Sequence, residues 1–380
     1  MRVLFSSTAG AGHFNPLVPL AHACRAAGHD VAVAAPASFA ESVGRAGLPH
    51  RPFADAPPDE LGALFARLPG LPHVEANEIV VRDVFAGLDA RSALAGLDET
   101  VQDWRPDVIV REPAEFASYV VAERRGVPHV VMAIGPAGLD DFMLPRVDAP
   151  LRALGAERGA DGLRAAPVVT LVPEVLDTPR SGTGQVTRVR YEASPASRVD
   201  PLPAWGDPDT SLVYASYGTV TGNLGPFGAV YPATVAALAD RPVRVLLTIG
   251  EASDPADLGP LPANVRVERF RPQQDVMPAA SAVVCHGGFG TTMTALAHGV
   301  PLVVVPLFAH DQFINADAVA AAGAGVALRG GVDALDEIAG ALDTLLADLS
   351  FAAGAGRVAD EIAALPPVSS AVTVVEKTGA

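Results

Sequence analysis

Short apolar runs alternate with longer, alanine-rich stretches along the whole chain. Successive positions within a run are apolar, which is typical of parallel strands covered by helices on both faces. Strand–helix alternation of this kind predicts an α/β fold with right-handed connections. The predicted strands are Val3–Phe5, Val31–Ala34, Val108–Val110 and Val130–Met132 in the first half, and Leu212–Tyr214, Val243–Leu247, Val265–Val267, Ala282–Val284 and Leu302–Val305 in the second.

A proline-rich stretch interrupts this alternation near the middle of the chain. It runs from Ser194 to Pro208, has no clear period, and is followed by a new strand and a new glycine loop. Such a stretch is typical of a linker between domains. We therefore expect two Rossmann-like domains, residues 1–200 and 201–362, and a helical tail, residues 363–380, that packs back on the first domain.

Two segments of the first half are apolar enough to line a binding pocket. Asp55–Leu97 has an irregular helical pattern, and Ala137–Leu154 contains three large apolar residues in a row. Pockets for small molecules are lined mainly by such side chains. The same patterns fit ordinary helix packing, and the sequence does not separate the two interpretations.

The types of basic residue argue against several classes of enzyme. Of the 27 basic residues, 26 are arginine, and the one lysine, Lys377, stands near the C-terminus. P-loop enzymes need a lysine on the phosphates, and Schiff-base enzymes need a buried lysine amine. A lysine close to a chain end, where fraying is common, suits neither task. This argues against P-loop NTPases, protein kinases and pyridoxal-phosphate enzymes.

The charge, the cysteines and the hydropathy limit the kinds of partner and the cellular compartment that we expect. The net charge is −16, and an acidic surface repels nucleic acids and anionic membranes. Cys24 and Cys285 stand far apart, which argues against a disulfide scaffold or a zinc site and for a reducing compartment. No apolar run reaches the roughly 18 residues that a membrane-spanning helix needs. We expect a cytoplasmic protein without a metal.

The loop after the first strand carries a candidate base, His13. Its Gly10-Ala11-Gly12 segment invites a dinucleotide interpretation, but Asn15 and Pro16 stand where that fingerprint has its third glycine. Open α/β sheets bind their ligands at the carboxyl ends of strands, and a histidine titrates near neutral pH. His13 is therefore a candidate general base, with an ordinary loop histidine as the alternative.

A second glycine-rich segment opens a helix in the second half of the chain. It reads Cys285-His286-Gly287-Gly288-Phe289-Gly290-Thr291-Thr292 and directly follows a predicted strand. Small residues let backbone N–H groups approach an anion at a helix N-terminus, where the helix dipole favours negative charge. Thr291 and His286 add side-chain donors. The segment predicts a phosphate site without lysine, with a structural glycine turn as the alternative.

Polar residues also follow two other predicted strands. Asp311 and Gln312 come after Leu302–Val305 and offer the acceptors and the donor that bind vicinal sugar hydroxyls. Glu112 comes after Val108–Val110 and could orient an imidazole such as His13. Glu115 is the competing candidate for that role. A helix cap and a surface ion pair with Arg111 are the respective structural alternatives.

Taken in chain order, these motifs resemble one enzyme family. The loop Gly12-His13-Phe14-Asn15-Pro16, the turn Arg111-Glu112-Pro113, the segment from Arg271 through Gln312 and the proline-rich linker match metal-independent glycosyltransferases of the plant UGT and bacterial macrolide type. The chain is most similar to actinobacterial enzymes that glycosylate antibiotics and other natural products. The resemblance spans essentially the whole chain and is most specific from Phe270 to Leu328.

The resemblance implies a fold and a set of roles. The fold would be GT-B, with two Rossmann-like domains whose parallel sheets face a central cleft. The N-terminal domain would bind the acceptor and the C-terminal domain the nucleotide sugar. The catalytic residues would be His13 as base and Glu112 as its helper. The donor-binding residues would be Gly218, Thr219, Phe270, Gln273, His286, Gly288, Gly290, Thr291, Asp311 and Gln312.

Two departures from the family bear on the donor. Phe270 stands where plant members carry a tryptophan, so we expect stacking on the base to be different or to be supplied by another residue. Thr294 stands where many UDP-sugar enzymes carry a glutamate that binds ribose hydroxyls. A missing carboxylate suits a sugar without a 2′-hydroxyl, so we favour a dTDP-deoxysugar over a UDP-sugar. The co-substrates would be this donor and a hydrophobic aglycone, and no other cofactor is expected.

The implied reaction is an inverting sugar transfer to a hydroxyl of the aglycone. Two alternatives stay open at this point: a sugar-nucleotide epimerase on the same fold, and a non-catalytic partner of a glycosyltransferase. A homodimer also stays open. The presence of His286, Asp311 and Gln312 argues against the non-catalytic partner.

Overall fold

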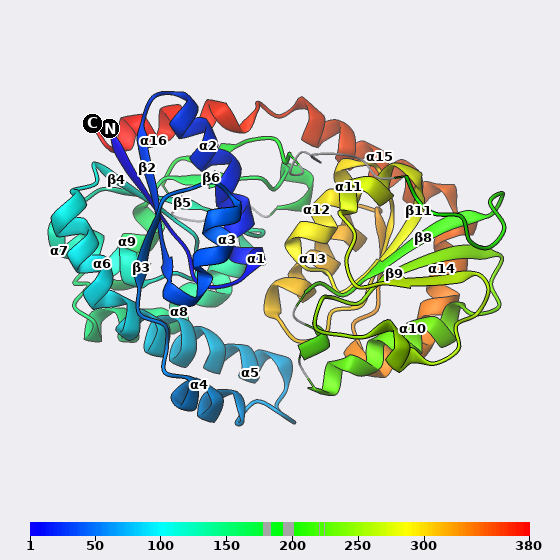
Figure 1. The fold of residues 1–380 in the computed structure, drawn as a ribbon. Helices are drawn as coiled ribbons and strands as arrows, with labels where there is room; N and C mark the ends of the chain where they lie inside the picture. Colours follow the sequence, from blue (N-terminus) through cyan, green and yellow to red (C-terminus); the bar gives the residue numbers. More distant parts are fainter. Residues whose placement is uncertain (178–183, 193–200, 220, 224) are drawn as a thin grey trace. The chain divides into compact units, whose positions relative to one another are not determined.

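The computed structural model describes residues 1–177, 184–192, 201–219, 221–223 and 225–380, and these form two compact units (Figure 1). Unit 1 comprises Met1–Val172, Thr178–Arg190 and Pro366–Ala380, and unit 2 comprises Pro173–Asp177 and Tyr191–Leu365, apart from the residues not described. Each unit is built on one parallel sheet with helices around it, so the predicted α/β fold of two parallel-sheet domains is confirmed.

Unit 1 contains a seven-stranded parallel sheet in the order β3-β2-β1-β4-β5-β6-β7. The first strand lies between the second and the fourth, so the strand order reverses beside it. Ligands of open α/β sheets bind at such a switch point. The four strands predicted for the first half are confirmed within β1, β2, β4 and β5. The strands are β1 (Arg2–Ser6), β2 (Asp30–Pro36), β3 (His50–Phe53), β4 (Val108–Arg111), β5 (His129–Met132), β6 (Val168–Thr170) and β7 (Val186–Arg188).

The helices of unit 1 pack on this sheet and on one another. Those from α5 to α6 form one continuous helical stretch, whose middle part, Val80–Asp89, is a π-helix. The segments expected to line a pocket contain α4, α5 and α8. The helices are α1 (Ala11–Phe14), α2 (Val18–Ala26), α3 (Ala40–Arg45), α4 (Pro58–Phe65), α5 (His73–Ile79), α6 (Ala90–Trp104), α7 (Ala117–Arg125), α8 (Gly138–Ala153), α9 (Gly159–Ala165) and α16 (Val372–Thr378).

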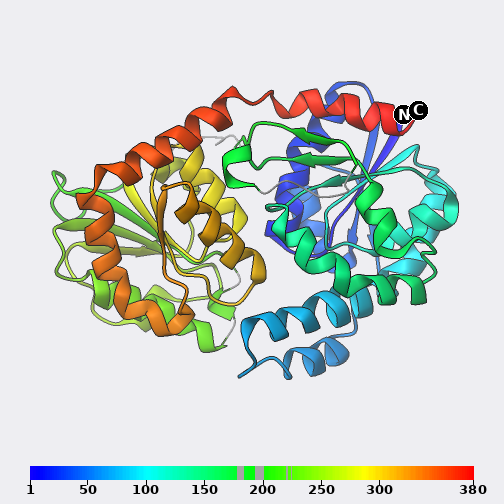
Figure 2. The same ribbon diagram turned by 180° about the vertical axis from the view of Figure 1, so that it is seen from behind.

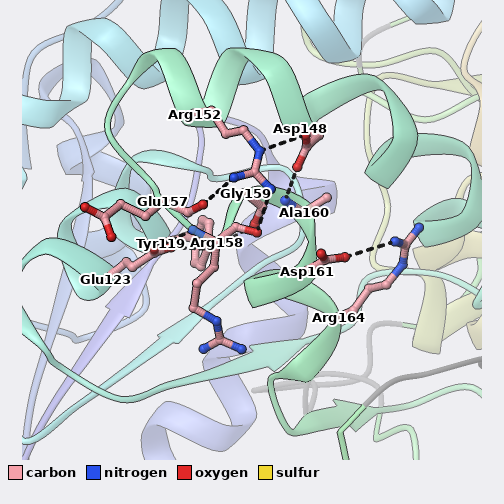
Figure 3. A network of polar contacts seen from close by, with 10 residues as sticks. All are labelled: Tyr119, Glu123, Asp148, Arg152, Glu157, Arg158, Gly159, Ala160, Asp161 and Arg164. Atoms are coloured by element: carbon pink, nitrogen blue, oxygen red, sulfur yellow. Dashed lines mark hydrogen bonds and ion pairs between the residues drawn. The ribbon is translucent and has the colours of Figure 1, made fainter.

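A polar network fixes α7, α8 and α9 to one another (Figure 3). The Tyr119 hydroxyl lies 2.6 Å from Glu123 Oε2 and 2.7 Å from the carbonyl oxygen of Gly159. Asp148 accepts a hydrogen bond from Arg152 and another from the backbone N–H of Ala160. Tyr119 is buried, and a buried hydroxyl needs such partners, whereas Asp148 and Arg152 are partly exposed. The network therefore fixes the helices that cover one face of the unit 1 sheet.

Unit 2 repeats the same topology with a six-stranded parallel sheet in the order β10-β9-β8-β11-β12-β13. Its first strand, β8, again lies beside the point where the order reverses. The five predicted strands of the second half are confirmed. The elements are β8 (Ser211–Ser216), α10 (Val230–Leu238), β9 (Val243–Thr248), β10 (Val265–Glu268), α11 (Gln273–Val276), β11 (Ala280–Cys285), α12 (Phe289–Ala297), β12 (Leu302–Val304), α13 (His310–Ala321), β13 (Gly325–Ala327), α14 (Ile338–Ala347) and α15 (Leu349–Ala364).

The chain passes between the units more than once. The segment Pro173–Asp177 belongs to unit 2, where the N–H of Val175 donates to Glu361. The last helix, α16, belongs to unit 1, and His29 Nε2 lies 3.1 Å from Glu376 Oε1 there. The two chain ends lie side by side in this unit (Figure 2). Part of the expected linker, residues 194–200, lies outside the described residues, and the rest belongs to unit 2.

No single helix in the described ranges has the length and the apolar character needed to cross a membrane. One bent pair, Gly331–Ala347 and Leu349–Ala364, passes that test of length and composition when joined, with a bend of 78°. Several of its apolar residues, such as Leu342 and Ile362, are buried in the unit.

Candidate active site

His13 and Glu112 lie together in unit 1. Strands β1 and β4 are hydrogen-bonded neighbours with Ser6 opposite Arg111, so the segments that follow them leave the same edge of the sheet. His13 is in the short helix α1 rather than in an open loop. Its Nδ1 is 3.2 Å from Glu112 Oε2, and the Glu112 side chain is fully buried. The structure therefore brings together the two residues predicted to be catalytic.

The Glu112 carboxylate is fixed by further donors. Its Oε1 accepts hydrogen bonds from the Thr8 N–H at 3.2 Å and the Thr8 hydroxyl at 3.0 Å. Its Oε2 accepts one from the Ala114 N–H at 2.6 Å. Burial alone would raise the pKa of Glu112, but the charge and hydrogen bond of His13, the hydrogen bond from the Ala114 N–H and the charge of Arg111 outweigh burial and lower it. Glu112 is therefore an ionised carboxylate that can hold His13 in one orientation.

Glu115, the competing candidate, makes different contacts. Its carboxylate accepts from the Ser118 N–H at 3.1 Å, near the start of α7, and burial raises its pKa. The buried Arg111 donates to the carbonyl oxygens of Glu115 and Pro113, each at 2.8 Å. These bonds shape the turn so that Glu112, and not Glu115, faces His13. The structural alternative for Glu112, a surface ion pair with Arg111, is wrong, because both side chains are buried.

The glycine-rich loop of unit 2 is shaped around the His286 ring. It joins β11 to α12. A Cβ atom on Gly288 would lie 2.6 Å from Cε1 and Nε2 of that ring, and a Cβ atom on Gly218 would lie 3.0 Å from them. Real Cβ atoms essentially never come as close as 2.6 Å, so an alanine at position 288 would displace the ring, and the 3.0 Å contact at position 218 is tighter than most real ones. Gly218, at φ +77°, also has a backbone conformation that favours glycine.

His286 has no charged partner among the residues that the structure describes. Its Nδ1 is buried there without a hydrogen bond. Burial lowers the pKa of His286 to about 4, so the imidazole is neutral at pH 7. A neutral imidazole offers one N–H donor and one acceptor. An orphaned buried nitrogen is costly, and a ligand group bonded to it would remove that cost.

Thr291 and Gln273 are brought together at the start of α12. The Gln273 amide donates to the Thr291 hydroxyl at 2.8 Å. Helix α12 has no side-chain cap and no acidic residue in its first turn. Its first backbone N–H groups therefore lack an internal partner and suit an anion. Gly290 lies in this turn, where nothing would contact an added Cβ atom within 4 Å.

Asp311 and Gln312 lie in the first turn of α13. Asp311 is half-buried. Gln312 is buried, and its Oε1 accepts hydrogen bonds from the N–H groups of Leu307 at 2.8 Å and Phe308 at 3.1 Å. Its amide oxygen is therefore already used by the loop, and its NH₂ group is the part suited to a sugar hydroxyl.

Sequence reasoning missed Asn315, one turn further along the same helix. Its Nδ2 donates to the Gly287 carbonyl at 2.7 Å, which connects α13 to the glycine-rich loop. The sequence held a signal for it, because Asn315 follows Gln312 at helical spacing.

The remaining residues predicted to bind the donor, and Thr294, also belong to unit 2. Phe270 is 58% exposed, which leaves surface of its ring available for stacking. Thr219 is exposed beside Gly218. Thr294 is buried, and its hydroxyl donates to the Gly290 carbonyl at 2.7 Å. The Tyr191 hydroxyl, which sequence reasoning missed, lies 2.9 Å from the Thr294 hydroxyl.

Both halves of the chain match one protein family. Residues 22–250 match the N-terminal domain, and residues 233–377 the C-terminal domain, of erythromycin biosynthesis protein CIII-like proteins. The chain belongs to this family. It is therefore a glycosyltransferase of the macrolide type with the GT-B fold, as the motifs predicted. Membership favours sugar transfer over the epimerase and the non-catalytic partner.

Named relatives of this glycosyltransferase are sugar transferases. It is 35% identical to the L-demethylnoviosyl transferase of Streptomyces niveus, over 96% of this chain and 95% of that one. The glycosyltransferase VinC in complex with dTDP matches with a TM-score of 0.77 at 26% identity, over 100% and 99% of the chains. The spinosyn rhamnosyltransferase SpnG, solved with thymidine diphosphate and with spinosyn aglycone, matches with a TM-score of 0.81 at 26% identity, over 99% and 100%.

No group of three or more His, Cys, Asp or Glu side chains that could hold a metal ion occurs within the described ranges.

Proposed function

We propose that this glycosyltransferase transfers a deoxysugar from a dTDP-sugar to a hydroxyl of a hydrophobic natural-product aglycone, with inversion at the anomeric carbon. Unit 1 would bind the acceptor and unit 2 the donor. The His13–Glu112 pair is the observation that carries the proposal, because an imidazole held by a buried, ionised carboxylate is suited to act as a general base. The dTDP complexes of VinC and SpnG and the aglycone complex of SpnG support the two substrate classes.

The acceptor hydroxyl loses its proton to His13. With Nδ1 held against Glu112, the ring accepts this proton at Nε2, and the carboxylate stabilises the imidazolium that forms. The acceptor oxygen then bonds to the anomeric carbon from the face opposite the nucleotide. The bond from that carbon to the diphosphate breaks, and dTDP leaves with the electron pair.

The leaving diphosphate is stabilised by neutral donors. These are the first N–H groups of α12, the Thr291 hydroxyl and the neutral His286 imidazole. Donors fixed before the reaction stabilise developing charge without having to reorganise. The proposed reaction therefore needs neither a metal ion nor a lysine on the phosphates. Asp311 and Gln312 would bind sugar hydroxyls, and Phe270 would stack on the base.

Thr294 supports dTDP over UDP. Its hydroxyl already contacts Tyr191 and Gly290, and it is buried, so no carboxylate at this position receives a ribose hydroxyl. A deoxyribose without a 2′-hydroxyl loses nothing at such a position. UDP-sugars stay the alternative donor.

A titration of the purified protein with dTDP, UDP and GDP tests this proposal. We expect dTDP to bind at least tenfold more tightly than GDP and more tightly than UDP, with no change when EDTA is added. Tenfold tighter binding of UDP than dTDP, about 1.4 kcal/mol, would overturn the choice of nucleotide. No binding of any of the three would overturn the proposed donor site. Anomer analysis of the product tests inversion.

A further inference from the structure

The π-helix Val80–Asp89 is an unusual element beside the proposed base. π-Helices occur mostly as single turns inside α-helices, and often at functional sites. Here ten residues adopt this form, and they pack against α4, α5, α6 and α8. This segment lies within Asp55–Leu97, the stretch that could line a pocket, but no sequence motif assigns a role to any of its residues.

Phe85 brings the π-helix into contact with His13. The two rings meet edge to face, with centroids 5.6 Å apart and an angle of 61° between their planes. Phe85 is only half-buried. The π-helix therefore contributes an apolar surface next to the imidazole.

Asp89 lies about one turn after Phe85 and is also only half-buried. The charges of His13, Glu112 and Glu115 act on its carboxyl group. Burial raises the pKa of Asp89 to about 6, and the neighbouring carboxylates add to that rise while His13 opposes it. No hydrogen bond or ion pair reaches this carboxyl group from within the described ranges.

Two other carboxylates of the same region, those of Asp55 and Asp83, accept hydrogen bonds from nearby donors. Asp55 accepts from the Ser38 N–H, and Asp83, on the same π-helix, accepts a two-point hydrogen bond from Arg82. A partly buried carboxylate without a donor is costly, because it has lost water and gained nothing in exchange. A donor on a bound molecule would remove this cost at Asp89.

We infer that Asp89 is an acceptor-binding residue, whose carboxylate accepts a hydrogen bond from a second hydroxyl or amino group of the aglycone, close to the hydroxyl that His13 deprotonates. Phe85 forms the apolar wall beside that group. The inference rests on the proposed function and adds a feature of the substrate. The enzyme selects acceptors that carry a second polar hydrogen near the glycosylated oxygen.

Matched acceptor probes test this inference. The pairs are 2-naphthol with 2,3-dihydroxynaphthalene and estradiol with estriol, since the second member of each adds a neighbouring hydroxyl. Affinities are measured by isothermal titration calorimetry on the dTDP-saturated protein. We expect the wild type to bind the second member about tenfold more tightly in at least one pair, as for a hydrogen bond to a charged group. Asp89→Leu should reduce this ratio to within twofold, and Asp89→Asn should give an intermediate ratio.

Asp83→Asn is the matched control. It removes a carboxylate from the same π-helix, but one that is paired with Arg82, and it should leave the ratio of affinities unchanged. The inference is overturned if the wild type binds both members alike or neither of them, or if the preference survives in Asp89→Leu. Binding of dTDP separates the two hypotheses. A protein that does not bind dTDP contradicts the proposed function, whereas normal dTDP binding with no effect of Asp89 contradicts only this inference.

Discussion

The two units share a topology, but each places a histidine in different surroundings. His13 follows the first strand of one sheet, has an ionised carboxylate 3.2 Å from Nδ1, and is a quarter exposed. His286 follows β11 of the other sheet, is packed between two glycines, and has its pKa lowered to about 4 by burial. An imidazole beside a carboxylate can take up a proton, and a buried neutral imidazole can donate a hydrogen bond without doing so. The surroundings, rather than the residue type, separate the proposed base from the proposed phosphate donor.

The comparison also explains how an acidic protein with one lysine can bind a diphosphate. With a net charge of −16, the molecule as a whole does not attract nucleotides. The predicted donor loop offers a helix N-terminus, hydroxyl groups and a neutral ring instead of ammonium groups. We expect salt to change the on-rate of dTDP little, since these donors act only at short range.

Replacing His13 should have the largest effect. We expect His13→Ala to lower kcat by about 10² to 10⁴, because the proposed general base is lost. The dTDP affinity should stay within twofold of the wild type, because no donor residue changes. Steady-state kinetics and dTDP titration of the same preparation check this. His22→Ala, a histidine of α2 near Arg25, is the matched control. A kcat within tenfold of the wild type would remove His13 from the base role and end the contrast with His286.

Gly288→Ala tests whether the position of the His286 ring matters for dTDP binding. We expect a smaller effect than for His13→Ala. The added Cβ atom would lie 2.6 Å from the His286 ring, which must move. The backbone at Gly288, with φ −61° and ψ 141°, accepts alanine without strain, so the ring displacement is the main change. We expect dTDP affinity to fall by about tenfold, or 1.4 kcal/mol.

Gly340→Ala is the control for this substitution, since no atom lies within 4 Å of its added Cβ. Calorimetric titration with dTDP compares the two variants. If Gly288→Ala binds dTDP as the wild type does, the fixed position of His286 does not matter for the nucleotide, and the second half of the comparison fails.

Sequence reasoning identified most of the strands because their apolar runs are continuous. The nine predicted strands are present, and the strands missed were short and mostly at sheet edges, such as β3 (His50–Phe53) and β13 (Gly325–Ala327). Edge strands are half exposed, so their residues lack the continuous apolar pattern on which the prediction relied. Segment Pro173–Asp177, which crosses to unit 2, left no signal in the pattern either.

Residues of the candidate site could be predicted from the sequence where a motif directly follows a strand. The pairing of His13 with Glu112 follows from β1 and β4 being neighbours, which strand order alone could suggest. The choice of Glu112 over Glu115 could not be made from the sequence, because it depends on the bonds that Arg111 makes to the turn. Thr8, Asn315 and Asp89 were missed because short polar side chains have no periodicity, and their partners are distant in the chain.

Thr8→Val should have the smallest effect. It tests how far the function of the His13–Glu112 pair depends on the hydrogen bonds that Glu112 accepts. The substitution removes the hydroxyl that donates to Glu112 Oε1 at 3.0 Å but keeps the backbone N–H that donates at 3.2 Å. Losing one hydrogen bond to a charged group of this kind costs about 1.5 kcal/mol or less, so we expect kcat to fall about three- to tenfold. Thr8→Ser should restore most of the activity because it keeps the hydroxyl.

The pH profile shows whether Thr8 acts through Glu112 or only through stability. Hydrogen bonds to a carboxylate stabilise its charged form and lower its pKa, so removing one raises the pKa of Glu112. The acidic limb of the kcat/KM profile should therefore move to higher pH in Thr8→Val and return in Thr8→Ser, while dTDP affinity stays unchanged in both. A fall in thermal stability with an unshifted pH profile would mean that Thr8 only supports the fold, and that the other donors to Glu112 suffice to keep it ionised beside His13.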